Sequence, residues 1–335
     1  MSSYGFSSIL EIVYSVGNMD KVKHFYCDYG GWNIVGAYAT PSKQMQFWGL
    51  EDDATGSECL IQSHGHPTGQ LRLVQFENVQ QKYLRSSQQP WDIGGIMDIN
   101  IRVHEVTNTF EELRELGWHG LSDPLLQVMG PYELYDILMK GYDDTIMAFT
   151  HRVKPVLNLT APIKLATHVY NSSVTVHDLE AAKAYYVEGL GCQVLNAYEV
   201  IKDSPQENMF GLPFNLADKV KCKACFLSFD GERDTVFQII EFEGITGKDF
   251  SQTTHPPNRG YMEYRVEVFG IQAYHESLLK KNISIHNSLQ TVQMEPYGHV
   301  EVFSVISPEG VWLSFIERKK GRLKLGAPNL VPRAF

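Results

Sequence analysis

The chain is 335 residues long, and its 29 basic and 39 acidic side chains give a formal net charge of −10. This balance argues against a general nucleic-acid-binding protein, which needs a basic face, and suits a protein that takes a small molecule. The length exceeds what a single core of usual size organises, so two domains are expected.

The N-terminal segment lacks the basic stretch and cleavage site of a signal peptide, and no apolar run approaches the ~20 residues of a membrane span. An odd number of scattered cysteines suits a reducing compartment. These are Cys27, Cys59, Cys192, Cys222 and Cys225. We therefore expect a cytoplasmic protein that contacts neither membrane nor nucleic acid.

The predicted elements follow one repeated order. A strand over residues 9–16 precedes a helix that begins after the N-cap Asn18 and ends near Gly30. Three strand-like runs come next, at residues 32–38, 58–63 and 71–77. A second unit repeats the order with a strand, a helix and a last strand, at residues 97–103, 107–116 and 146–150. The unit is therefore β-α-β-β-β.

The second half of the chain repeats the first. Matching positions occur in the same order in both halves: Phe25 with Tyr185, Cys59 with Cys225, Phe76 with Phe242 and Pro131 with Pro296. Shared order over this length indicates duplication, so four units are expected. We predict a first domain at residues 1–152, a linker at 153–164, a second domain at 165–318 and a C-terminal extension at 319–335.

Two strands in corresponding places carry polar residues on the face opposite their apolar face. Residues 260–268 alternate in this way, with Glu263 and Arg265 on the polar face, and residues 95–104 do the same with Asp98. Polar groups on an inward face are costly unless that face lines water or a ligand. The pattern predicts a cleft in each half.

The repeated unit resembles the vicinal oxygen chelate superfamily, which includes glyoxalases, extradiol dioxygenases and bleomycin-binding proteins. The segments SVTVHDLEAAKAYYVEGLG and SPEGVWLSFIE carry the resemblance most clearly. It implies an α+β fold of two domains, each a pair of consecutive units that form a half-open, cleft-bearing mixed sheet. The fold hosts many chemistries, so it does not by itself give the function.

The resemblance also places metal ligands on the first and last strands of each unit. The corresponding positions are Glu11, Arg72, Asp98 and Ala148 in the first half and Asn171, Gln238, Glu263 and Ser314 in the second. No histidine falls on them, whereas an iron site of a dioxygenase needs two imidazoles and a carboxylate. We expect no metal cofactor, with a divalent metal held by Glu11, Asp98, Asn171, Gln238 and Glu263 as the alternative.

The leading site hypothesis is the C-terminal cleft. Glu263 would act as the base, and Asn171 and Gln238 would hold a substrate oxygen. The alternative is a Glu263 that pairs with Arg265 on the same strand face. For Glu11, Asp98 and Arg72, a structural acid–base cluster is the preferred interpretation.

Further candidates lie around this cleft. His299 would shuttle protons and Glu301, on the same strand face, would contact the substrate together with Arg265. Trp48 and Phe210, each followed by Gly-Leu, would form aromatic walls of the two clefts or, equally, belong to the core. His64 and His66 resemble a short metal clip, but they lie in a Gly/Pro loop without obvious partners, so a turn is the preferred interpretation. His168 is predicted to be a surface residue.

These residues are compatible with three functions. The first is an enzyme that performs lyase or isomerase-type proton transfer on a small organic substrate, aromatic or carbonyl-bearing. The alternatives are a metal-dependent extradiol-type dioxygenase or glyoxalase-like lyase, and a protein that binds a small molecule without reaction. A homodimer stays open, although four units can close both clefts within one chain.

Overall fold

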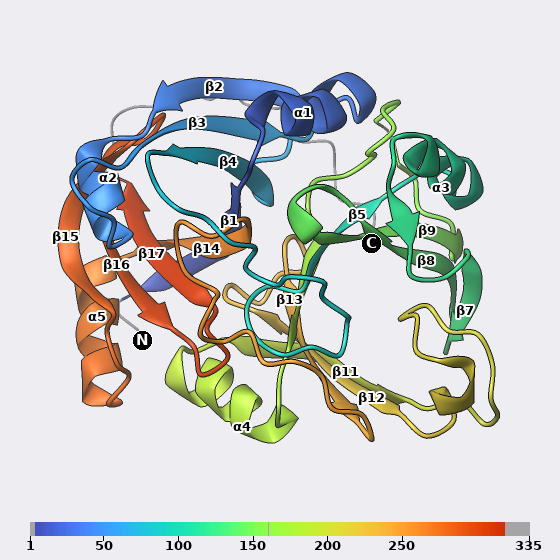
Figure 1. Ribbon diagram of the computed structural model, residues 1–335. Helices are drawn as coiled ribbons and strands as arrows, with labels where there is room; N and C mark the ends of the chain where they lie inside the picture. Colours follow the sequence, from blue (N-terminus) through green and yellow to red (C-terminus); the bar gives the residue numbers. More distant parts are fainter. Residues whose placement is uncertain (1–3, 160, 319–335) are drawn as a thin grey trace.

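The computed structural model describes residues 4–159 and 161–318, so the predicted extension at 319–335 lies outside the described residues. Two large mixed sheets make up the molecule (Figure 1), as the predicted α+β fold requires. In the described part of the chain, no helix is long and apolar enough to cross a membrane.

The first sheet has the order β15-β16-β17-β14-β1-β4-β3-β2 and is curled into a half-barrel. Its strands from the start of the chain are β1 (Gly5–Ser15), β2 (Asn33–Ala39), β3 (Thr55–Gln62) and β4 (Gln70–Glu77). Its strands from the end of the chain are β14 (Gly260–Phe269), β15 (Asn287–Met294), β16 (Gly298–Ile306) and β17 (Trp312–Arg318).

The second sheet has the order β11-β12-β13-β10-β5-β9-β8-β6, and β7 pairs with β8. Its earlier strands are β5 (Asp98–Arg102), β6 (His119–Gly120), β7 (Leu125–Met129), β8 (Tyr132–Lys140) and β9 (Ile146–Lys154). Its later strands are β10 (Asn171–Thr175), β11 (Gln193–Val200), β12 (Lys221–Ser228) and β13 (Phe237–Glu243).

The pairing of the units differs from the prediction. The first unit joins the fourth through antiparallel β1 and β14, and the second joins the third through antiparallel β5 and β10. The predicted linker 153–164 therefore connects two units of one sheet, and neither sheet corresponds to residues 1–152 or 165–318. One physical reason is visible at β1, where Glu11 lies opposite Arg265 of β14 and forms an ion pair with it.

Each helix in the described part of the chain connects consecutive strands of one sheet. Two helices follow the first strands of units one and three, as their N-caps Asn18 and Asp178 predict. The first is α1 (Met19–Lys23), which continues as η1 (His24–Tyr29), and the second is α4 (Leu179–Lys183), which continues as η3 (Ala184–Gly189). The other helices are α2 (Ser42–Phe47), α3 (Val106–Glu115), η2 (Tyr142–Asp144), η4 (Phe214–Leu216) and α5 (Ile271–Lys280).

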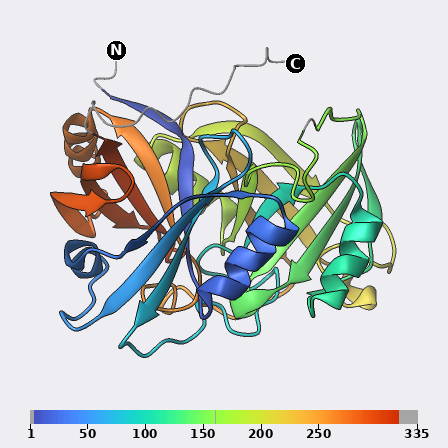
Figure 2. The same cartoon turned by 90° about the horizontal axis from the view of Figure 1, so that it is seen from above.

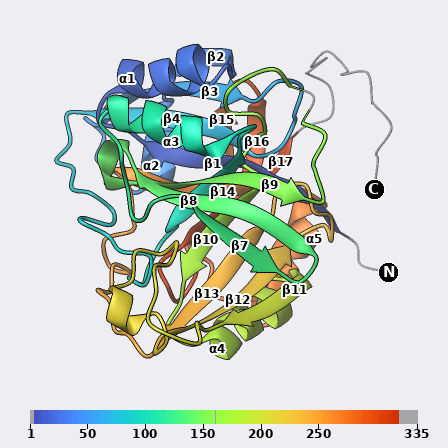
Figure 3. The same cartoon turned by 90° about the vertical axis from the view of Figure 1, so that its right-hand side faces the viewer.

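The helices of units one and two contact each other across the junction of the sheets, and those of units three and four do the same (Figures 2 and 3). Tyr29 of η1 donates a hydrogen bond to Glu112 of α3, and Tyr274 of α5 donates one to the Leu190 carbonyl after η3. One apolar core spans this junction, whereas two smaller apolar clusters lie on the inner faces of the first and second sheets. The inner faces are where the predicted polar residues project.

Candidate functional site

The inner face of the first sheet holds an ion-pair network centred on Glu11. Arg72 donates to both carboxylate oxygens at 2.7 and 3.0 Å, Arg265 donates at 2.8 Å, and the Tyr297 hydroxyl donates at 3.1 Å. Arg72 also pairs with Glu58 at 2.7 Å. Burial acts to raise the pKa of Glu11, but the two guanidinium groups outweigh it and hold the value at about 2.

Glu263 belongs to the same network. Its carboxylate accepts hydrogen bonds from Arg265 Nε at 3.0 Å and from Trp48 Nε1 at 2.8 Å, and all three side chains are buried. Asn171 and Gln238, by contrast, lie on β10 and β13 of the second sheet. The expected grouping of these three residues in one cleft is therefore not present, and Glu263 is paired with Arg265 as in the alternative interpretation.

The other residues predicted around Glu263 are also separated. His299 and Glu301 lie on β16 of the first sheet, where His299 is exposed opposite Gln293. Trp48 is a buried hydrogen-bond donor of the ion-pair network rather than the wall of an open cleft. Phe210 alone among them lines the open pocket described next.

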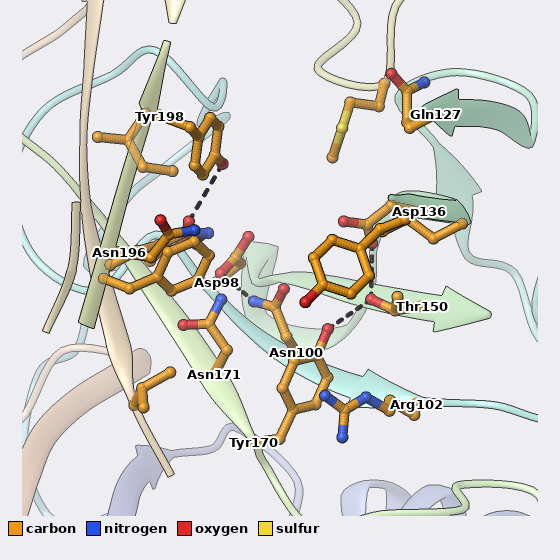
Figure 4. A pocket seen from close by; sticks show the side chains of 18 of the residues that line it. Asp98, Asn100, Arg102, Gln127, Asp136, Thr150, Tyr170, Asn171, Asn196 and Tyr198 are labelled. Carbon is orange, nitrogen blue, oxygen red and sulfur yellow. Dashed lines mark hydrogen bonds between the residues drawn. The ribbon is translucent and has the colours of Figure 1, made fainter. Parts of the chain in front are cut away.

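A cavity of about 350 Å³ opens on the inner face of the second sheet (Figure 4). Its walls come from strands β5, β7, β8, β9, β10, β11, β12 and β13, together with Met209 and Phe210 from the loop after β11. Asp98, Asn171 and Gln238 line it, so the structure brings together one predicted position of the first half and two of the second.

Asp98 lies on the floor of this pocket. It is 2% exposed and accepts a hydrogen bond from Asn100 Nδ2 at 2.8 Å. Burial raises its pKa to about 6, although hydrogen bonds from Ser173 and Asn100 favour the charged form. Next to it, Asn171 is 3% exposed, and its Oδ1 has no hydrogen-bond partner within residues 4–159 and 161–318. Both side chains therefore keep polar capacity for a ligand.

Asp136 faces the same space from β8 (Figure 4). Its carboxyl accepts a hydrogen bond from Thr150 at 3.0 Å, and the Thr150 hydroxyl lies 2.7 Å from the Tyr170 hydroxyl. Burial raises the pKa of Asp136 to about 7, and the nearby charge of Asp98 adds to the rise. Burial also raises the pKa of Tyr170 to about 12, so its hydroxyl remains a donor at neutral pH.

Two arginines also line the pocket, Arg102 and Arg152. The Arg102 guanidinium lies 3.9 Å from the ring centre of Tyr170, and that of Arg152 lies 4.6 Å from the ring centre of Tyr132. Arg152 Nε is buried without a hydrogen-bond partner among the described residues. This side of the pocket therefore offers donors to an anionic or carbonyl oxygen.

Sequence reasoning missed Asp136, Thr150, Tyr170 and Arg152. A signal was present for Asp136, because it lies two positions from both Leu134 and Leu138 and therefore shares their strand face. All three line the cavity. An acidic residue that alternates with leucines on the inward face of a strand indicates a carboxyl that points into a cleft.

Comparisons of the sequence with protein-family models and with curated proteins found no significant match. Solved structures do match. Glyoxalase I from maize (Zea mays) is 14% identical with a TM-score of 0.60, over 94% of this chain and 93% of that one. A point mutant of that enzyme is 15% identical with a TM-score of 0.61 over the same shares of each chain.

A provisionally assigned dioxygenase from Bacillus subtilis is 8% identical, with a TM-score of 0.56 over 95% of this chain and 87% of that one. These proteins belong to the vicinal oxygen chelate superfamily. The chain has the vicinal oxygen chelate fold. The resemblance seen in the sequence is thereby confirmed at the level of the fold.

The metal positions of the vicinal oxygen chelate fold do not suit a metal in this chain. In the first sheet they hold Glu11, Arg72, Glu263 and Ser314, and the carboxylates are already paired with buried guanidinium groups. In the second sheet they hold Asp98, Ala148, Asn171 and Gln238, which offer one carboxylate and two neutral amides. The Oε1 atom of Gln238 already accepts a hydrogen bond from the Tyr198 hydroxyl at 3.4 Å. Neither set provides the ligands that a transition metal prefers.

Proposed function

We propose that the pocket of the second sheet is the active site of an enzyme that moves protons on a small organic substrate, with Asp98 and Asp136 as the proton-transferring groups. The observation that carries this proposal is the presence of two carboxyls without guanidinium partners in one cavity. A volume of about 350 Å³ suits a small organic molecule. The fold similarity to glyoxalase I and to a provisionally assigned dioxygenase supports an enzyme of this fold class.

The two carboxyls differ enough to take different roles. With a pKa of about 6, Asp98 is mostly ionised at neutral pH and can accept a proton from an activated C–H beside a carbonyl. With a pKa of about 7, Asp136 retains its proton in part of the population and can donate it to the carbonyl oxygen as the enolate forms. Return of the proton to a different atom gives isomerisation, and loss of a leaving group gives a lyase reaction.

Neighbouring groups position these carboxyls and the substrate. Asn100 holds one oxygen of Asp98, which orients the other oxygen of the carboxylate. Thr150 connects Asp136 to Tyr170, whose hydroxyl is a donor at neutral pH. The free Oδ1 of Asn171 can accept a hydrogen bond from a substrate hydroxyl or amine.

The remaining walls indicate the substrate class. Arg102 and Arg152 can neutralise a carboxylate, or the negative charge that develops on an enolate oxygen. Aromatic rings cover another part of the surface, among them Tyr198, Phe226 and Phe210. The pocket therefore suits a small, flat acid that bears a carbonyl group.

A direct test compares Asp98→Asn and Asp136→Asn with wild type in a screen of small aromatic and aliphatic oxo acids. Proton exchange at carbon, followed by NMR in deuterated water, detects the reaction even when its final product is unidentified. Each substitution is expected to lower the rate by roughly 100- to 10,000-fold. Asp123→Asn, at an exposed loop position, is the matched control.

Retention of full activity in both carboxyl variants would refute the assignment. A compound that binds the wild-type pocket and is recovered unchanged, without exchange, would instead support the alternative of a protein that sequesters its ligand. The aromatic walls of the pocket suit that alternative as well.

A further inference from the structure

A second group of potential ligands, none of which lines the pocket, lies where the two sheets meet. His66 comes from the loop between β3 and β4, His168 precedes β10, and Asp234 belongs to the loop between β12 and β13. One ring nitrogen of each histidine and one carboxylate oxygen of Asp234 all lie within 4.8 Å of one another. In the described part of the chain this is the only such group of three histidine, cysteine or acidic side chains.

The three residues are held in place by direct hydrogen bonds. His66 Nε2 lies 3.1 Å from Asp234 Oδ1, while Thr68 donates its hydroxyl to Asp234 Oδ2 at 2.8 Å. His168 Nε2 donates to the Asp234 carbonyl oxygen at 2.8 Å, which leaves Nδ1 unprotonated in a neutral imidazole. Outer hydrogen bonds that fix the tautomer of a histidine and orient a carboxylate are typical of the second shell of metal sites.

We propose that His66, His168 and Asp234 form a site for one divalent transition-metal ion of the zinc type. Two imidazoles and one carboxylate are ligands that zinc accepts, and water would complete a tetrahedral arrangement. The site is separate from the positions at which the fold carries metal ligands, because those positions lie on strands and all three of these residues lie in loops.

The solvent exposure of two of the three residues suits such a site. The side chains of His66 and Asp234 are 30% and 42% exposed, so an ion can reach them from solvent, whereas His168 is buried, which corrects its predicted surface position. The two imidazole rings stack at 3.5 Å between centres with an angle of 7° between their planes. Parallel rings cannot both aim a lone pair at one ion, so one ring must tilt. His66 is the ring with room to tilt, because it is partly exposed whereas His168 is buried.

An ion at this place would tie the first sheet to the second. His66 belongs to the first unit, and both other ligands belong to the third unit, which is part of the other sheet. An ion that binds only the folded chain stabilises it in proportion to its affinity and concentration. The expected consequence is a rise of the melting temperature when zinc is added.

The test uses untagged full-length protein, first stripped with a chelator and then titrated with Zn²⁺ by isothermal calorimetry. Wild type is expected to bind one ion per chain. The His66→Ala and Asp234→Asn variants are expected to lose affinity by more than the roughly 10- to 100-fold that loss of a second-shell partner costs. His64→Ala is the matched control, since His64 is an exposed histidine of the same loop.

Two further readouts complete the test. Zinc is expected to raise the melting temperature of wild type and His64→Ala but not that of His66→Ala, and Co²⁺ is expected to give wild type the visible spectrum of a tetrahedral site. The proposal is overturned if wild type binds no ion, or if His66→Ala and Asp234→Asn bind Zn²⁺ as tightly as wild type. Equal loss of binding in His64→Ala and His66→Ala would also overturn it.

Discussion

The substitution Glu11→Gln tests whether the ion-pair network of the first sheet is structural. Glu11 is fully buried and receives hydrogen bonds from Arg72, Arg265 and Tyr297. The amide has nearly the same shape as the carboxylate but carries no charge. The change therefore leaves two buried guanidinium groups with less compensating charge and leaves the packing almost intact.

The pKa of Glu11 gives the size of the expected effect. The value is about 2 in the folded chain, against an ordinary value of 4.5. A carboxyl lowered in this way contributes about 3 kcal/mol to the free energy of unfolding above pH ~5. The contribution is lost as pH falls from about 4.5 to about 2. Breaking a buried ion pair by removal of one partner typically costs about 3–5 kcal/mol, which agrees.

Urea unfolding followed by tryptophan fluorescence measures this difference. At pH 7, Glu11→Gln is expected to lower the free energy of unfolding by about 3–5 kcal/mol. Glu111→Gln is the control, because Glu111 forms an ion pair with Arg114 whose side chains are 61% and 57% exposed. Exposed pairs of this kind contribute about 0–1 kcal/mol.

The reasoning is refuted if Glu11→Gln stays within about 1 kcal/mol of wild type at pH 7, as an exposed pair would. It is also refuted if the difference between the two proteins is as large at pH 3 as at pH 7. The stabilisation that the wild-type carboxylate provides decreases below its unfolded-state pKa. The difference in free energy of unfolding between the two proteins must therefore become smaller as the pH falls.

Other predictions concern the pocket and the junction of the sheets. The rate of the pocket reaction should rise with pH through about 6, as Asp98 ionises, and fall through about 7, as Asp136 loses its proton. The pH profile is therefore bell-shaped in wild type, and the residual rate of Asp136→Asn should no longer fall at alkaline pH. Arg152→Met should raise KM for an anionic substrate roughly 10- to 100-fold and leave that of its neutral amide unchanged. Tyr264→Phe should lower the free energy of unfolding by about 1–3 kcal/mol in urea titrations, because the buried Ser172 hydroxyl loses its partner at 2.7 Å.

The order of elements and the fold could be predicted from local patterns, whereas the pairing of units could not. Alternation in residues 260–268 and the caps Asn18 and Asp178 indicated strands and helices that the structure contains. The choice of partner depends on contacts such as Glu11 with Arg265, which lie 254 positions apart. Four similar units offer several pairings with the same strand pattern, so no local signal distinguishes them.

The same limit applies to the sites. Each unit contributes its inward residues by alternation, but the pairing decides which carboxyl meets which cation. Under the expected pairing, Glu263 would face Asn171, whereas under the observed pairing it faces Trp48 and Arg265. The contact of His66 with His168 is equally non-local, since each lies in a segment without a distinctive pattern of its own.

The two inner faces differ in how their buried carboxyls are paired. Glu11 and Asp98 occupy corresponding first strands, and both are almost fully buried. Guanidinium groups in direct contact hold the pKa of Glu11 at about 2, whereas Asp98 has no such partner, and burial raises its pKa to about 6. A buried charge that is not paired persists at a cost in stability, and such a cost is typical of places where a ligand or a proton transfer uses the group. The filled inner face of the first sheet and the cavity on the second thus fit the proposal that Glu11 is structural and that Asp98 takes part in a reaction.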